Sequence, residues 1–207
     1  MTKTDKDVPV ENSLPLVTIR DPYVWMQSMC RHRYAAYGDW KTPSHCPNIL
    51  KENVDVNDHD YDNNNNTIPA SVHYSETEPF ITYHKSLPHL WNDWYRLYYN
   101  ATFPRIIVRF EDLLFYGQQV TEALCKCGGG VTREDRRYPH FVHVSESAKL
   151  GTAAHGKHKT GLVGALIKYS TFKHRLDNLS AEDIQAAVHI FDSEIMDTFG
   201  YTNPILP

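Results

Sequence analysis

Along the chain, short continuous runs of apolar residues alternate with segments in which apolar residues recur at helical spacing. Leu14–Ile19 is an apolar, partly β-branched run that predicts a buried parallel strand. The run ends at Arg20, and Asp21 then supplies a helix N-cap, followed by a proline at the first helical position. We therefore expect a helix over Pro22–Tyr37, with Arg20 at the carboxyl end of the strand.

The same alternation continues downstream. Residues 87–100 carry an aromatic and leucine stripe at helical spacing, typical of a helix packed on a sheet. Later elements are expected as a strand over 105–110, helices over 118–126 and 161–176, a short strand or extended edge over 138–144, and a last helix over 181–199. Strands alternating with helices predict an α/β fold with a mainly parallel sheet flanked by helices.

The length and apolar content predict one domain. A chain of 207 residues, 41% of them hydrophobic, can bury one core, so we expect a single domain over residues 14–207 after a flexible tail over residues 1–13. Residues 51–69 are rich in Asp and Asn and predict a low-complexity, flexible insertion. A calcium loop starting at Asp58 would place Asn63 at the glycine position and Pro69 at the glutamate position, so no ligand is expected there.

Composition excludes several classes of function. The net charge of -4 argues against a nucleic-acid partner, and no apolar run is long enough to span a bilayer. The polar N-terminus has no signal-peptide core. The four cysteines are too few to define a disulfide framework and are expected as buried thiols. No zinc-ligand spacing is present, so no metal is expected. Glycosylation triplets begin at Asn65, Asn100 and Asn178, a pattern that often arises by chance.

The strand–helix junction is the first candidate binding site. In open α/β sheets, ligands bind at the carboxyl edge of the strands. Arg20 lies at that edge and Ser28 lies in the second turn of the following helix. A guanidinium and a hydroxyl beside a helix N-terminus suit a phosphate group. The alternative is an ordinary turn with Arg20 in a surface ion pair.

These residues resemble a known family. Arg20, eight residues before Ser28 across a strand–helix junction, resembles the 3′-phosphate-binding element of sulfotransferases that use 3′-phosphoadenosine 5′-phosphosulfate (PAPS). Pro104–Leu114, PRIIVRFEDLL, resembles that family's later strand with its V-x-Y-E-D-L pattern, Phe110 replacing the tyrosine. The likeness extends from Leu14 to about residue 128. It implies a sulfotransferase-like, P-loop nucleotide-binding-like fold, PAPS as co-substrate and a hydroxyl acceptor on a carbohydrate or another small molecule.

A second phosphate-binding element is expected near residue 155. Gly151–Lys157, GTAAHGK, matches P-loop spacing, but His158 replaces the Ser or Thr that would hold magnesium. The segment also looks like the late basic loop of sulfotransferases, so Gly156 and Lys157 are expected to contact the cofactor. Three alternatives stay open: a nucleotide kinase or NTPase using Gly151–Lys157, a flexible basic loop, and a non-catalytic interaction module with a sulfotransferase-like fold.

One part of the family pattern has no counterpart in the sequence. The resemblance implies a Gly-Thr-rich 5′-phosphosulfate loop upstream of Arg20, where only a polar tail is found. We therefore expect an N-terminally incomplete or degenerate relative that binds adenosine 3′,5′-bisphosphate weakly and transfers no measurable sulfate. No catalytic base is assigned, and Glu111 and Asp112 are expected either as an acid–base pair or as turn caps. The chain would work in the Golgi lumen if an anchor precedes it, and in the cytoplasm otherwise.

Overall fold

The computed structural model describes residues 13–42, 44–58, 60–74, 80–130 and 162–205. Its elements are β1 (Leu16–Ile19), α1 (Pro22–Arg31), β2 (Ala36–Tyr37), β3 (Ala70–His73), β4 (Ile81–His84), α2 (Leu87–Tyr99), β5 (Ile106–Arg109), α3 (Phe110–Phe115), α4 (Gly117–Cys127), α6 (Leu162–Ser170), α7 (Phe172–Arg175), α8 (Ala181–Ile190) and α9 (Ser193–Thr198). The helix expected over 118–126 is confirmed as α4. The tail over 1–12 and the edge expected over 138–144 lie outside the described residues.

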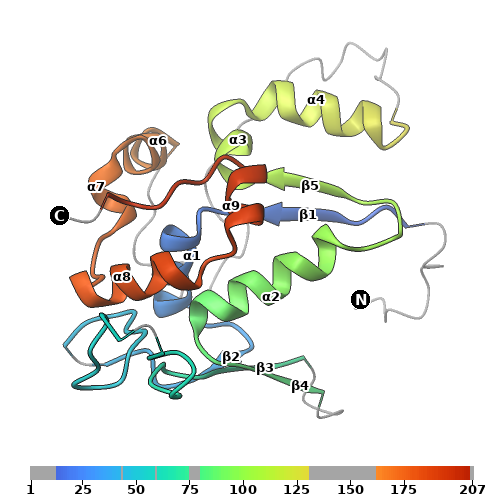
Figure 1. Cartoon of the computed structure of the whole chain (residues 1–207). Helices are drawn as coiled ribbons and strands as arrows, with labels where there is room; N and C mark the ends of the chain where they lie inside the picture. Colours follow the sequence, from blue (N-terminus) through green and yellow to red (C-terminus); the bar gives the residue numbers. More distant parts are fainter. Residues whose placement is uncertain (1–12, 43, 59, 75–79, 131–161, 206–207) are drawn as a thin grey trace.

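The two predicted strands form a parallel pair. β1 and β5 run side by side, with Leu16 opposite Ile106 and Ile19 opposite Arg109. Helices flank this sheet, with α1 and α2 on the β1 side and α3 and α4 on the β5 side in Figure 1. The α/β class with flanking helices is confirmed, but the expectation of a mainly parallel sheet is wrong for the described residues, where two strands are parallel and three lie in an antiparallel sheet. A second, antiparallel sheet in the order β2-β3-β4 was not predicted, because its strands are short and interrupted by polar residues.

The first strand is less buried than its apolar run suggested. Val17 and Ile19 are buried, whereas Leu16 is 55% exposed. The expected burial of this strand is therefore confirmed for one face of β1 only, whereas on the other face of the pair the neighbouring Val108 of β5, opposite Thr18, is buried. The apolar run correctly predicted the position of the strand, but it does not indicate which faces of the strand other elements cover.

The helices begin where their capping residues predicted. Three of the expected helices are shorter than the sequence suggested, because one ends early and two are interrupted. Asp21 Oδ1 accepts the amide N–H groups of Tyr23 and Val24, so α1 starts as predicted. It ends at Arg31 and not near residue 37, because the chain turns to pair β2 with β3. The helix expected over 161–176 is split into α6 and α7, and the last helix is split into α8 and α9.

The break between α8 and α9 has a packing cause. Phe191 leaves the helical conformation, and its ring makes edge contacts with Tyr23 at 5.2 Å and with Trp91 at 5.5 Å between centroids. Asp192 then caps α9 by accepting the Ile195 amide N–H at 3.1 Å. Edge-to-face aromatic contacts of this kind are worth about 0.5–1.5 kcal/mol each beyond the area they bury, which favours the break over one continuous helix.

Helix α2 holds the backbone at the carboxyl end of β1. Its buried side chains include Leu90, Trp91 and Tyr95, whereas Leu97, expected in the same stripe, is 69% exposed. The Trp91 indole N–H donates to the Arg20 carbonyl at 3.1 Å, and the Tyr95 hydroxyl donates to the Thr18 carbonyl at 3.1 Å. These two bonds fix the end of the strand, and with it the origin of the Arg20 side chain.

The acidic, Asn-rich segment is anchored to the core. Where the structure describes residues 51–69, it finds turns, with Tyr61 only 3% exposed and Thr67 fully buried. The Tyr61 hydroxyl donates to the Ala186 carbonyl at 2.9 Å, and the Thr67 hydroxyl donates to the Lys85 carbonyl at 2.9 Å. Two buried side chains thus attach this polar segment to the core, a feature that its composition does not indicate, and the flexibility of the segment stays a prediction.

Two of the four cysteines form a disulfide instead of the expected buried thiols. Cys30 in α1 pairs with Cys46, with 5.8 Å between their Cα atoms. Trp40, in the segment before Cys46, is 1% exposed and belongs to the same core cluster as Met29 and Cys30 of α1. Cys125 and Cys127 are exposed and unpaired.

This disulfide has a measurable consequence for stability. It closes a loop with a sequence separation of 16 residues, and the chain-entropy model gives about 3 kcal/mol for a loop of that size. Reducing the bond, or replacing both cysteines with serine, is expected to lower the free energy of unfolding by about that amount in urea titrations. Alkylation that finds Cys30 and Cys46 as free thiols in the oxidised, folded chain would contradict the pairing.

Candidate functional site

Arg20 and Ser28 come together at the carboxyl end of β1. The Arg20 Nη1 atom donates to Ser28 Oγ at 2.7 Å, across the strand–helix junction. The junction imposes this proximity, because Asp21 and Pro22 start the helix immediately and Ser28 returns to the strand side almost two turns later. The Ser28 hydroxyl itself bonds to the Val24 carbonyl at 3.2 Å.

Two further cations lie near Arg20 and Ser28. Arg31 donates from Nη2 to Ser28 Oγ at 3.3 Å. Lys168 of α6 lies close enough that the charges of Arg31 and Arg20 depress its pKa, although burial of its ammonium contributes most to that depression. No carboxylate among the described residues forms an ion pair with Arg20, Arg31 or Lys168. We call Arg20, Ser28, Arg31 and Lys168 the cation cluster.

The Arg20 guanidinium packs against two aromatic rings. Its central carbon lies 4.9 Å from the Phe110 ring centroid and 5.1 Å from that of Tyr169. The two rings also contact each other, with centroids 5.4 Å apart. Phe110 therefore packs on Arg20 through its ring alone. Cation–π contacts of this kind fix the plane of the guanidinium while leaving its N–H groups available in that plane.

Arg20 is a largely buried cation whose hydrogen-bond donors are not all satisfied. Burial lowers its pKa to about 10, although the Glu111 carboxylate opposes that shift. Its Nε atom is buried and has no hydrogen-bond partner. An orphaned donor on a desolvated guanidinium is costly and is usually relieved by an anion or by water. The cluster is therefore chemically suited to bind a phosphate or sulfate group.

Glu111 and Asp112 serve as turn and cap partners and do not form an acid–base pair. Glu111 accepts the Asp21 backbone N–H at 3.0 Å and the Tyr201 hydroxyl at 2.9 Å, whereas Asp112 pairs with Arg109 at 3.7 Å. Burial, and then the charge of Glu111, raise the Tyr201 pKa, so this phenol stays protonated and donating. Glu111 therefore joins the ends of β1 and β5 to the C-terminal segment.

A polar cavity adjoins the cation cluster. It has a volume of about 290 Å³ and shares Lys168 with the cluster, and it is also lined by Tyr169, whose ring contacts Arg20. Its other polar lining comes from Arg109, Glu111 and Arg175, whose Nε donates to Asp21 at 2.6 Å. The cavity is large enough for a small group such as a ring or a ribose, and its charged walls are already partly paired.

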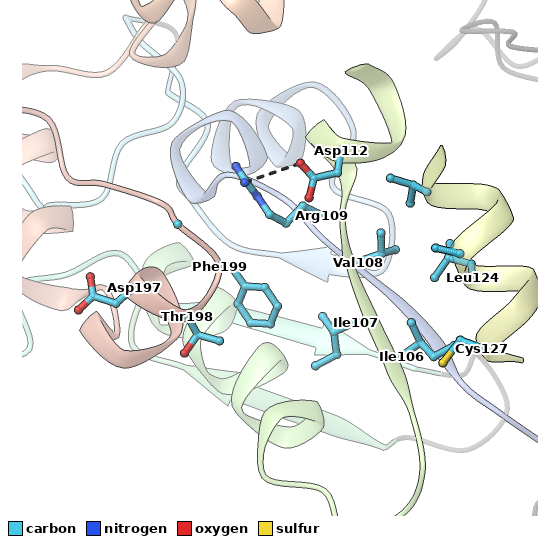
Figure 2. A pocket seen from close by; sticks show the side chains of 13 residues that line it. Ile106, Ile107, Val108, Arg109, Asp112, Leu124, Cys127, Asp197, Thr198 and Phe199 are labelled. Atoms are coloured by element: carbon cyan, nitrogen blue, oxygen red, sulfur yellow. Dashed lines mark ion pairs between the residues drawn. The ribbon is translucent and has the colours of Figure 1, made fainter. Parts of the chain in front are cut away.

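A second hollow lies beside β5 and has a different character. Its volume is about 710 Å³, and Figure 2 shows Ile106, Ile107 and Val108 lining it, with Leu124 on one side and Phe199 on the other. The Arg109–Asp112 pair lies at one end. Polar groups do not converge on this apolar groove, and neither Arg20 nor Ser28 lines it, so it is not part of the candidate site.

Sequence reasoning found half of the cluster. Arg31 lies three residues after Ser28 on the same helical face, a spacing that could have been noticed in advance. Lys168 and Tyr169 gave no local signal, because the contact between α3 and α6 that brings them in is long-range. Gly156 and Lys157, together with the P-loop-like segment Gly151–Lys157, lie outside the described residues.

No group of three or more His, Cys, Asp or Glu side chains in the described part of the chain is arranged to hold a metal ion. Among the described helices, none has the length and apolar character needed to cross a membrane. In comparisons with known proteins, the chain matched no family model, no curated protein and no solved structure.

Proposed function

We propose that this chain is a sulfotransferase-like protein whose cation cluster binds the 3′-phosphate of PAPS or of its product, adenosine 3′,5′-bisphosphate. The observation that carries the proposal is that Arg20 and Arg31 both donate to the Ser28 hydroxyl, with Lys168 near enough to feel their charges, while none of the three forms an ion pair with a carboxylate among the described residues. Three cations held together in a partly buried place repel one another, and a dianionic phosphate removes that repulsion.

The geometry of the individual groups supports a phosphate over a carboxylate ligand. The Arg20 fork has one N–H on Ser28 and a buried, unpartnered Nε, so it offers donors to more than one oxygen. Arg31 and Lys168 lie on α1 and α6, so the cations come from different elements, and several donors of this kind suit an anion with several acceptor oxygens. The cavity beside Lys168 and Tyr169 offers room for the nucleoside part of the same ligand.

PAPS would supply a sulfuryl group for transfer to a hydroxyl of a carbohydrate or another small molecule. The residues of the cation cluster would bind the far end of that co-substrate and orient it, and they do not touch the sulfuryl group. Their part in catalysis is positioning, which gains rate by fixing the reacting group relative to the acceptor. The acceptor class rests on the family resemblance alone.

The proposed compartment is the lumen of an oxidising organelle such as the Golgi. The Cys30–Cys46 disulfide supports it, because disulfides persist in oxidising compartments and are rare in the cytosol.

Calorimetric titration of the full chain tests the proposed ligand. Adenosine 3′,5′-bisphosphate is expected to bind in the high-micromolar to millimolar range, because a few charge-assisted hydrogen bonds must first offset the cost of association. The same titration with ATP and magnesium is expected to give no binding. Magnesium-dependent ATP binding would favour a nucleotide kinase or NTPase instead, and binding of neither ligand would leave a non-catalytic module.

A further inference from the structure

We infer that Asn100 is an N-glycosylation site of this protein. The inference rests on the proposed oxidising compartment and not on the sulfotransferase proposal. Asn100, Ala101 and Thr102 form an acceptor triplet at the C-terminal end of α2. Both Asn100 and Thr102 are exposed. No hydrogen bond within the described part of the chain occupies the Asn100 side-chain amide or the Thr102 hydroxyl.

Hydrogen bonds hold the backbone around this triplet in one conformation. Asn100 has helical dihedral angles at the end of α2, and its backbone N–H donates to the Arg96 carbonyl at 3.0 Å. The Arg105 guanidinium then binds the loop from inside, donating to the carbonyls of Ala101 at 2.7 Å, Phe103 at 3.2 Å and Tyr99. Asn100 thus lies on an ordered turn at the end of α2, where it is exposed among the described residues and can carry a bulky sugar.

Apolar side chains beside Asn100 give a second, independent reason. Leu97 is 69% exposed and Phe103 is 48% exposed, three residues before and three residues after Asn100. Leu97 shares a helical face with Asn100, because residues three apart on a helix are neighbours. An oligosaccharide on Asn100 would cover both side chains with its C–H faces, which lowers the cost of their exposure to water.

The other two acceptor triplets are less suitable, because their hydroxyl groups are already hydrogen-bonded in the folded chain. The hydroxyl two residues after Asn65 belongs to Thr67, which is fully buried and donates to the Lys85 carbonyl. The hydroxyl two residues after Asn178 belongs to Ser180, which caps α8 and donates to Asp183 at 2.9 Å. In the folded chain, the hydroxyl of the Asn100 triplet alone among the three is exposed and unoccupied.

The chemistry is a group transfer that the host supplies. The Asn100 Nδ2 atom forms a bond to the anomeric carbon of an oligosaccharide carried on a lipid pyrophosphate. The bond between that carbon and the pyrophosphate oxygen breaks, the lipid pyrophosphate leaves, and Nδ2 loses one proton. No oxidant or reductant is required.

The full chain, directed into the secretory pathway of cultured animal cells, tests the site. We expect one glycan, seen as a single shift on gels that peptide N-glycosidase removes, with peptide mass spectrometry finding aspartate at position 100 afterwards. Asn100→Gln and Thr102→Ala should each lose the shift, Thr102→Ser should keep it, and Asn178→Gln should leave it unchanged as the matched control.

Two results would overturn the inference. One is a full chain that carries no glycan while a co-expressed glycoprotein is modified, and the other is a glycan that survives Asn100→Gln. Alkylation of Cys30 and Cys46 in the same sample tests the disulfide pairing separately. Titration with adenosine 3′,5′-bisphosphate tests the sulfotransferase proposal separately.

Discussion

Replacing Arg20 with alanine is expected to weaken the binding of adenosine 3′,5′-bisphosphate by about ten- to a hundred-fold. A hydrogen bond to a charged group contributes about 1.5–3 kcal/mol, and every 1.4 kcal/mol is a factor of ten in affinity. The Arg20 guanidinium is already oriented by Ser28 and by the rings of Phe110 and Tyr169, so little side-chain entropy is lost on binding. Ser28→Ala should cost less, about five-fold, because a neutral hydroxyl contributes about 1 kcal/mol.

Calorimetry measures these losses of affinity, and two further variants serve as controls. Arg20→Lys keeps the charge and loses the planar fork, so it should recover only part of the affinity. Arg33→Gln removes an exposed arginine that contacts the Tyr37 ring and lies outside the cation cluster, and it should bind as the unmodified chain does. Circular dichroism establishes that each variant is folded. Equal affinity of Arg20→Ala and the unmodified chain would remove Arg20 from the site.

Replacing Asp183 with alanine is expected to cost about 3–5 kcal/mol in the free energy of unfolding. Asp183 is 2% exposed, and its Oδ1 atom accepts the Ile49 and Leu50 amide N–H groups at 2.7 and 3.3 Å. Its Oδ2 atom accepts the Ser180 hydroxyl at 2.9 Å and lies 3.0 Å from His45 Nε2. Removing the carboxylate leaves these partners without an acceptor, and breaking a buried charged network by deleting one partner costs that much.

Urea denaturation with and without the substitution measures this cost. The neighbouring Glu182→Ala is the matched control, because Glu182 is exposed in the first turn of α8 and should change stability by about 0.3–1 kcal/mol. Asp183→Asn should fall between the two, since an amide oxygen can still accept but its NH₂ group opposes the donors around it. A loss below 1 kcal/mol for Asp183→Ala would show that the loop carrying Ile49 is not held by this carboxylate.

The sequence predicted the features that local chemistry determines. Asp21 and Pro22 predicted the start of α1. Ser180 predicted the start of α8, where its hydroxyl accepts the Asp183 amide N–H. The same local rule brought Arg20 and Ser28 together, because the distance between them depends only on a strand, a cap and two helical turns. The α/β class followed from the alternation of apolar patterns.

The remaining features depend on contacts between distant segments. The break at Phe191 arises from its packing on Tyr23 and Trp91, and no property of its immediate neighbours signals it. Lys168 reaches the cation cluster only because α6 packs on α3. The Cys30–Cys46 pairing likewise needs a loop that folds back onto α1. Sequence patterns of period two or 3.6 carry no information on such contacts.

The claim that Arg20 binds the 3′-phosphate is tested most directly by four titrations. The unmodified chain and Arg20→Ala are each titrated with adenosine 3′,5′-bisphosphate and with adenosine 5′-monophosphate, which lacks the 3′-phosphate. This double-mutant cycle isolates the energy of one contact from any general effect of the substitution on the fold.

The cycle predicts that the bisphosphate binds the unmodified chain at least ten-fold more tightly than the monophosphate does, and that this advantage falls to about two-fold or less in Arg20→Ala, because a charge-assisted contact of about 1.5–3 kcal/mol is lost. An advantage of the same size in both chains would contradict the account, since the 3′-phosphate would then be recognised elsewhere or not at all.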